Sequence, residues 1–229
     1  MSDTKKVQNL EGDEAVIAKA KDFWTRNNKP ILIACAAIIL LGGGWLVYKN
    51  LIQEPKETKA NEAMFKAEEY FRMDSLRKAL DGDGQYPGFL AVSKKYSGTD
   101  AANLAHYYAG VCFVKLDDNA NAVKELKKFS TSAKQIQQRA YKLLGDAYAD
   151  LGQPKDALDY YKQAAHHFEA DKAASAEALF SAAYLADKML KDSKEAIALY
   201  KELKEKYPND QYSYQADVYL AGLGVYNAY

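Results

Sequence analysis

Residues 141–164 read YKLLGDAYADLGQPKDALDYYKQA, and a related stretch, AHYYAGVCFVKLDDNANAVKEL, occupies residues 105–126. Gly110 and Gly145 are 35 residues apart, and so are Ala122 and Ala157. Each stretch has two helical patterns joined by a short turn, and runs of β-branched residues are nearly absent. One helical pair cannot bury its apolar face alone, so repetition predicts that the pairs stack. The sequence therefore predicts an all-α fold.

The spacing resembles the tetratricopeptide repeat, whose period is about 34 residues. Its small, aromatic and alanine positions occur here in the same order. A small residue such as Gly145 lets the first helix of a pair approach the second closely, and an aromatic side chain fills the wedge between neighbouring pairs. We expect residues 59–229 to form a tetratricopeptide-repeat α-solenoid.

A third unit matches less regularly. Ala196, Tyr200 and Pro208 fit the second-helix alanine, the aromatic position and the closing proline. Tyr184, however, falls where the small residue of the first helix is expected, which predicts either a shifted helix boundary or a looser crossing. The last helix, at 211–226, is expected to be either a cap of the stack or the first helix of a pair that lacks its second helix.

The most apolar stretch is PILIACAAIILLGGGWLVY at residues 30–48, which carries no charge between Lys29 and Lys49. As a helix it would extend roughly 28 Å at about 1.5 Å per residue, which suits a bilayer core of about 30 Å. We therefore expect a single transmembrane helix in contact with the lipid bilayer. The expected organisation is a cytoplasmic tail at 1–29, the transmembrane helix at 30–48, a linker at 49–58 with a hinge at 53–57, and a periplasmic repeat domain at 59–229.

Small residues recur at heptad spacing within this apolar segment. Ala36 pairs with Gly43, and Ala37 pairs with Gly44. Such a face allows another transmembrane helix to pack closely. An ordinary lipid-facing helix with flexible glycines is the alternative, and the sequence does not decide between them.

Composition and motifs exclude several classes of function. The 31 basic and 31 acidic residues balance, which gives no electrostatic reason to expect nucleic acid as a partner. The adjacent residues His166 and His167 point in different directions on a helix, so they cannot share a metal ion. The loop that follows Asp81 and Asp83 lacks the glycine and glutamate of a calcium site. We expect no catalytic residue, no metal site and no cofactor, and hence no enzyme.

Protein binding is then the expected role of the solenoid, through the concave side of the first helices. The predicted protein-binding positions are Leu104, Tyr107, Val111 and Val114 in the first repeat, and Arg139, Lys142, Asp146 and Ala149 in the second. The first set suits an apolar segment or a partner helix. Alternatively, residues 59–72 of the same chain fill this groove.

The complete arrangement resembles the YfgM-like family of bacterial inner-membrane proteins. The resemblance rests on FWTRNNK at 23–29 before the apolar segment, on Gly44 and Trp45 near its end, and on the degenerate repeats that follow. The stretch ALDGDGQY at 79–86, followed by Phe89, is similar to repeat proteins of Bacteroidota.

The resemblance implies an ancillary subunit of the Sec translocon, with its N-terminus in the cytoplasm and its repeat domain in the periplasm. The implied partners are the SecYEG channel, a PpiD-type membrane-anchored chaperone and emerging secretory polypeptides. A scaffold for assembly or export of envelope and outer-membrane proteins is the alternative.

Overall fold

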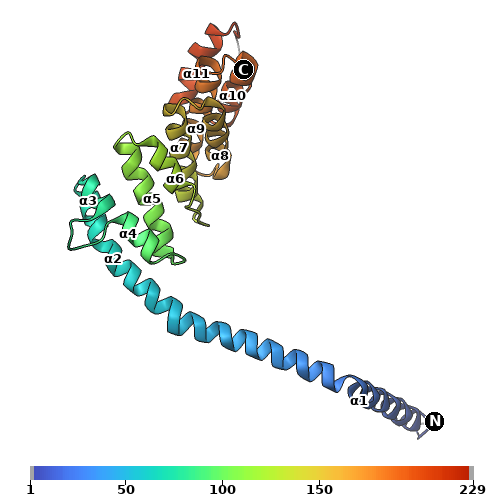
Figure 1. Ribbon diagram of the computed structural model, residues 1–229. Helices are drawn as coiled ribbons and strands as arrows, with labels where there is room; N and C mark the ends of the chain where they lie inside the picture. Colours follow the sequence, from blue (N-terminus) through green and yellow to red (C-terminus); the bar gives the residue numbers. More distant parts are fainter. Residues whose placement is uncertain (1–2, 227–229) are drawn as a thin grey trace. The chain divides into compact units, whose positions relative to one another are not determined.

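The computed structural model describes the backbone of residues 3–226 and the side chains of residues 16–226. Over these residues the chain is helical, with no strand (Figure 1). Residues 1–2 of the expected tail and 227–229 of the expected repeat domain lie outside the described residues. The chain divides into two compact units, Met1–Pro55 and Lys56–Tyr229, and each is described by itself.

The first unit consists of helix α1, Asp3–Tyr48, and the π-helical segment η1, Lys49–Gln53. Its most apolar window has a mean hydropathy of 2.3, and none of that window is buried. Ile38 and Leu40, for example, are 69% and 74% exposed. Water disfavours so much exposed apolar surface, whereas lipid accepts it. By length and composition, this helix is suited to cross a membrane.

The predicted linker at 49–58, with its hinge at 53–57, is helical in the structure. The π-helical turn of η1 leads into helix α2, Glu54–Arg72, and the N–H of Glu54 donates to the carbonyl of Lys49. Pro55 lies directly after this π-helical turn, in a helical run that continues without a break, and it lacks the N–H that would donate into the preceding turn. The proline that suggested a break is therefore accommodated within a continuous helical run.

The second unit is a succession of antiparallel helices, seen in Figure 1 from cyan to red. After α2 the helices are α3 Leu76–Asp81, α4 Phe89–Lys95, α5 Asp100–Lys115, α6 Asn119–Leu126, α7 Lys134–Asp150, α8 Pro154–His167, α9 Lys172–Lys188, α10 Ser193–Lys206 and α11 Gln211–Gly222. The helices α5–α6, α7–α8 and α9–α10 form three consecutive hairpins. Helix α11 follows as the expected cap and buries Ser213, Ala216 and Leu220.

Glycine sits at the crossing of the first two hairpins, as the sequence predicts. A Cβ atom added to Gly110 would lie 2.4 Å from Cγ of Leu126. The same atom on Gly145 would lie 2.4 Å from Cδ1 of Tyr161. Both distances are far below van der Waals contact, so these helices pack as closely as they do because the residue has no side chain.

In the third hairpin, the small residue of the first helix lies one position earlier than the repeat spacing predicts. Its turn spans 189–192, one residue longer than the turn at 151–153. Counted from the start of each first helix, Ala183 therefore takes the place of Gly145 and is fully buried, whereas Tyr184 is 43% exposed. The predicted shift of the helix boundary is confirmed, and the alternative of a looser crossing stays a prediction.

Two groups of buried side chains hold the second unit together. The N-terminal core cluster includes Met64, Leu80 and Phe89 and is built mainly from α2 to α5. The C-terminal core cluster includes Leu179 and Tyr200 and is built mainly from α7 to α11. Partly buried Val114 packs against both clusters, which makes the core continuous along the stack.

Candidate functional site

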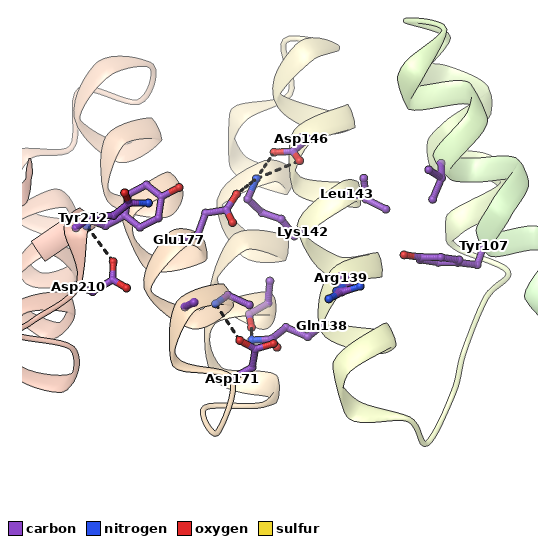
Figure 2. Close-up of a pocket in the computed structure, with 15 residues that line it drawn as sticks. Tyr107, Gln138, Arg139, Lys142, Leu143, Asp146, Asp171, Glu177, Asp210 and Tyr212 are labelled. Atoms are coloured by element: carbon purple, nitrogen blue, oxygen red, sulfur yellow. Dashed lines mark hydrogen bonds and ion pairs between the residues drawn. The ribbon is translucent and has the colours of Figure 1, made fainter. Parts of the chain in front are cut away.

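A groove of about 610 Å³ lies along the first helices of the three hairpins. Its walls come from α5, α7 and α9, and the start of α11 closes one end. Figure 2 shows Tyr107 and Tyr212 at opposite ends, with side chains of α7 and α9 between them. Successive first helices line one side of a stack because each hairpin repeats the same crossing.

Five of the predicted protein-binding residues meet in this groove: Tyr107, Val111, Arg139, Lys142 and Asp146.

The other three are not among its lining residues. Leu104 packs against the N-terminal core cluster, Ala149 packs against the C-terminal one, and Val114 packs against both. They lie on the same helices as the groove residues, but their side chains pack against the core.

Helix α2 does not line the groove. Its Phe71 ring lies edge-on to the ring of Tyr108, with centroids 5.2 Å apart. The carboxylate of Glu57 accepts hydrogen bonds from the backbone N–H groups of Asp100 and Ala101, at 2.7 and 2.8 Å. These contacts hold α2 against the start of α5 and its Tyr108 side. The alternative in which residues 59–72 fill the groove is therefore right for Leu104 and Val114, which share the N-terminal core cluster with Met64 of α2, and wrong for the part at Tyr107 and Val111.

One end of the groove is apolar. Tyr107 and Val111 of α5 face Leu143 of α7 there. The ring of Tyr107 packs on Phe129, with centroids 5.1 Å apart, and burial raises the pKa of its hydroxyl. This end offers a pre-formed surface for an apolar side chain.

The middle of the groove holds a partly buried ion pair. Nζ of Lys142 lies 2.8 Å from Oδ1 of Asp146 and 3.4 Å from Oε1 of Glu177. The hydroxyl of Tyr161 donates to the same Asp146 oxygen, at 2.8 Å. Burial lowers the pKa of Lys142, but the two carboxylates outweigh this effect and raise it above the ordinary value. Lys142 is therefore charged, and its charge is balanced within the groove.

Arg139 also faces the groove but makes no ion pair within residues 16–226. Its positive charge opposes the burial effect on Tyr107 by lowering the pKa of that hydroxyl. Arg139 is thus a cation near the apolar end of the groove, and no carboxylate of the described residues forms an ion pair with it.

The sequence reasoning missed Gln138. This side chain is only 1% exposed, and its Nε2 donates to the carbonyl of Ala164 and to Oγ of Ser175, both at 2.9 Å. A backbone carbonyl can only accept, which fixes the orientation of the amide. Oε1 of Gln138 then has no hydrogen-bond partner among the described residues.

The acidic end of the groove was also missed. It is formed by Asp171, Glu177 and Asp210. Asp171 and Asp210 are the N-caps of α9 and α11, where each accepts a backbone hydrogen bond. Counted from the start of each first helix, Glu177 takes the place of Arg139. The sequence spacing between Ala157 and Ala196 points instead to Ala178, so the repeat alone did not reveal Glu177. The two caps come from turns, which the repeat pattern does not orient.

A second cavity, of about 420 Å³, adjoins α5 and α6. Nδ1 of His106 lies 2.7 Å from Oε2 of buried Glu125, and Nζ of Lys128 lies 2.7 Å from its Oε1. Burial raises the pKa of Glu125, but these two partners lower it more. His106 thus links the two helices of the first hairpin. No cluster of three metal-ligating side chains occurs in the described part of the chain.

In the first unit, Ala36, Ala37, Gly43 and Gly44 are exposed along α1. A Cβ atom added to either glycine would meet nothing within 4 Å. Close packing of another helix on this face stays a prediction.

Residues 177–210 match the model of the tetratricopeptide repeat family. The solenoid is of the tetratricopeptide type. The match begins within α9 and ends at Asp210, so it covers most of the third hairpin and includes Glu177 and Asp210 of the groove, but not Asp171. A comparison with curated proteins found no match. Tetratricopeptide solenoids are typically non-catalytic scaffolds for protein–protein interaction, and the groove lies where such a scaffold offers a concave surface.

Proposed function

We propose that the protein is a membrane-anchored scaffold whose tetratricopeptide groove binds an extended segment of a partner protein. The observation that carries this proposal is the convergence of Tyr107, Lys142 and Glu177, from three successive first helices, on one groove of about 610 Å³. A groove of this kind combines an apolar anchor with a few polar groups that orient a ligand. The helices that carry these side chains are held by the core clusters, which limits the ordering cost of binding.

We further propose that the protein is an ancillary subunit of the Sec translocon in a bacterial inner membrane. The exposed apolar surface of α1 supports an anchor, and the resemblance to the YfgM-like family supports the partners. The N-terminus is then cytoplasmic and the solenoid periplasmic. The expected partners are the SecYEG channel, a PpiD-type chaperone and emerging secretory chains.

Site-specific photo-crosslinking tests this function in intact membranes. A photoreactive phenylalanine analogue replaces Tyr107 in the groove, and the matched control places it at exposed Lys201 on α10. After solubilisation in mild detergent, mass spectrometry is expected to find secretory chains, SecY or the chaperone crosslinked at Tyr107 and not at Lys201. The proposal fails if both positions give the same products.

A second probe at Tyr214 distinguishes the alternative scaffold. Tyr214 and Val218 are one turn apart on α11 and are 63% and 72% exposed. An exposed apolar pair of this kind offers a second contact surface. Crosslinks to outer-membrane assembly factors, without SecY at any probe, would favour a role in envelope assembly or export.

A further inference from the structure

We propose that the groove selects a cationic extended segment and sets its direction. A lysine or arginine of the partner lies at the acidic end formed by Asp171, Glu177 and Asp210, and an apolar side chain lies at the Tyr107 end. This inference rests on the proposed function of the groove as a protein-binding site.

The charges of the groove support this choice of partner. Its lining includes two basic side chains, Arg139 and Lys142, and four carboxylates. Lys142 is paired within the groove with Asp146 and Glu177. The two caps, Asp171 and Asp210, are paired with no described cation, so the acidic end has excess negative charge.

The helix ends do not cancel this excess. A helix N-terminus carries the equivalent of about half a positive charge, whereas each capping carboxylate carries a full negative one. Oδ1 of Asp171 accepts from Ala174 N–H, and Oδ1 of Asp210 accepts from Tyr212 N–H. The second oxygen of each carboxylate accepts no hydrogen bond from a described residue. Two acceptor oxygens are thus available to the ammonium or guanidinium group of a partner.

The floor of the groove also favours a ligand rich in donors. Gln138 lines it and leaves Oε1 as a buried acceptor without a partner among the described residues. A buried acceptor of this kind gains from an N–H group and gains nothing from another carboxylate.

The opposite end of the groove, at Tyr107, favours an apolar side chain of the partner over a cationic one. Arg139 and Tyr107 both line the groove at this end, and Val111 and Leu143 complete an apolar wall there. A cationic side chain would meet repulsion from Arg139 at this end, whereas an apolar one would pack on Tyr107. The segment therefore binds with its apolar side chains towards α5 and its cation towards α9 and α11.

Peptide binding tests the inference on the full chain in nanodiscs of phosphatidylcholine. Fluorescence anisotropy compares the labelled peptides GSLFAAKRKSG, GSLFAAQNQSG and GSLFAAEDESG. We expect the basic peptide to bind roughly tenfold or more tightly than the acidic one, with a preference that weakens as salt is added.

The double variant Asp171→Asn with Asp210→Asn removes two charges and retains both caps, since asparagine caps a helix about as well as aspartate. We expect it to weaken binding of the basic peptide by roughly tenfold and to leave the neutral peptide unchanged. The matched control is Asp192→Asn, which changes the cap of α10 outside the groove and is expected to change neither affinity. Circular dichroism checks that all variants keep their helix content.

The outcomes separate the two proposals. If the acidic peptide binds as well as the basic one, or if the double variant keeps the wild-type preference, the charge selection is overturned while the groove remains a binding site. If no peptide binds and Tyr107 gives no specific crosslink, the proposed function itself is contradicted.

Discussion

The second and third hairpins solve the same packing problem with different residues. In α7–α8, Gly145 receives the ring of Tyr161, and the hydroxyl of that ring donates to Asp146. In α9–α10, Ala183 stands at the glycine position, and the equivalent Tyr200 is fully buried with no hydrogen-bond partner for its hydroxyl among the described residues. Both hairpins thus have a small residue at this position of the first helix, whereas the polar surroundings of the tyrosine hydroxyl differ between them.

The largest effect is expected for Gly145→Val. The new side chain would collide with the ring of Tyr161, which cannot move away because it lies in the C-terminal core cluster. We expect a loss of about 3 kcal/mol in the free energy of unfolding, measured by urea denaturation of the full chain in detergent. The control is Gly222→Ala at the end of α11, where an added Cβ meets nothing within 4 Å. Equal stability of both variants would show that the close crossing is unimportant.

Replacing the two buried tyrosines by phenylalanine is expected to have different effects on the free energy of unfolding. Tyr161→Phe removes a hydrogen bond to the Asp146 carboxylate and should cost about 1.5 kcal/mol in the free energy of unfolding. Tyr200→Phe removes a buried hydroxyl without a described partner and should be neutral or slightly stabilising.

Thermal unfolding followed by circular dichroism gives both values under the same conditions. A matching loss in the two variants would mean that Tyr200 has a polar partner equivalent to Asp146, and the contrast between the hairpins would disappear.

The turns of the two hairpins sharpen the comparison further. Gly152 has φ of 69° and Lys191 has φ of 57°, both in the left-handed region that favours glycine. Lys191→Gly should therefore stabilise the third hairpin by up to about 1 kcal/mol, whereas Gly152→Ala should destabilise the second by about as much. Urea denaturation of both variants measures the signs, and a loss of stability in Lys191→Gly would contradict the strain argument.

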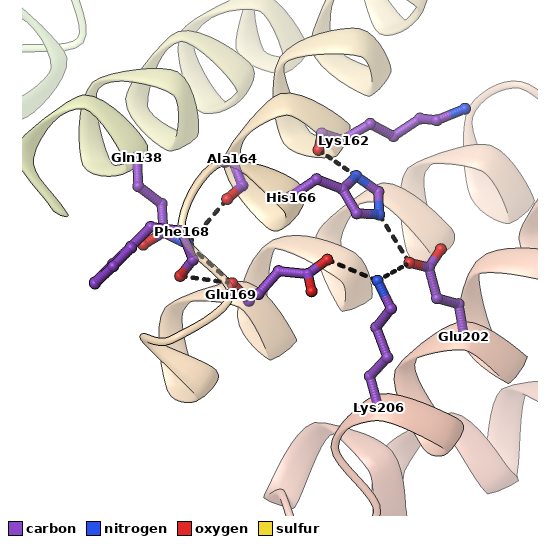
Figure 3. A network of polar contacts seen from close by, with 9 residues as sticks. Gln138, Lys162, Ala164, His166, Phe168, Glu169, Glu202 and Lys206 are labelled. Atoms are coloured by element: carbon purple, nitrogen blue, oxygen red, sulfur yellow. Dashed lines mark hydrogen bonds and ion pairs between the residues drawn. The ribbon is translucent and has the colours of Figure 1, made fainter. Parts of the chain in front are cut away.

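The smallest effect concerns acid stability at the third hairpin. Figure 3 shows Glu202 between His166 and Lys206, with Nε2 of His166 at 2.7 Å and Nζ of Lys206 at 3.0 Å. Burial raises the pKa of Glu202, but these two partners lower it below its usual 4.5. A carboxylate with a lowered pKa in the folded state stabilises the fold above its unfolded pKa, and this stabilisation is lost as the pH falls through the folded value.

Glu202→Gln should therefore reduce the loss of stability below pH 4.5, measured as the urea midpoint across a pH series. Glu205→Gln changes an exposed residue of the same helix and serves as the control. An unchanged acid profile in Glu202→Gln would exclude this network as a contributor.

Much of the fold was predictable because the responsible signals are local. The glycine and alanine positions of the first two hairpins each report how closely one helix meets its neighbour, and Gly110 and Gly145 do so in the structure. The one-residue shift at Tyr184 was visible as an irregularity, but which residue replaced the glycine depended on the length of the turn. The predicted hinge was helical because the chain reaches Pro55 through the π-helical turn η1 and stays helical beyond it.

The candidate site was predictable only in part. Tyr107, Arg139 and Lys142 were found because they repeat on the same face of successive first helices. Gln138 and the capping residues Asp171 and Asp210 were not found, since their approach to the groove depends on how a turn ends and where the next helix starts.

The amino-acid sequence by itself determined the helical class, the repeat, and an apolar segment long enough to span a membrane. These depend on periodicity and composition, which each stretch of chain carries without its neighbours. Only the tertiary structure decided that α2 packs beside Tyr108 rather than in the groove, and that Asp171, Glu177 and Asp210 gather at one end of it. The physical reason is that a helix fixes the direction of its own side chains, whereas the turns and crossings between helices decide which of them meet.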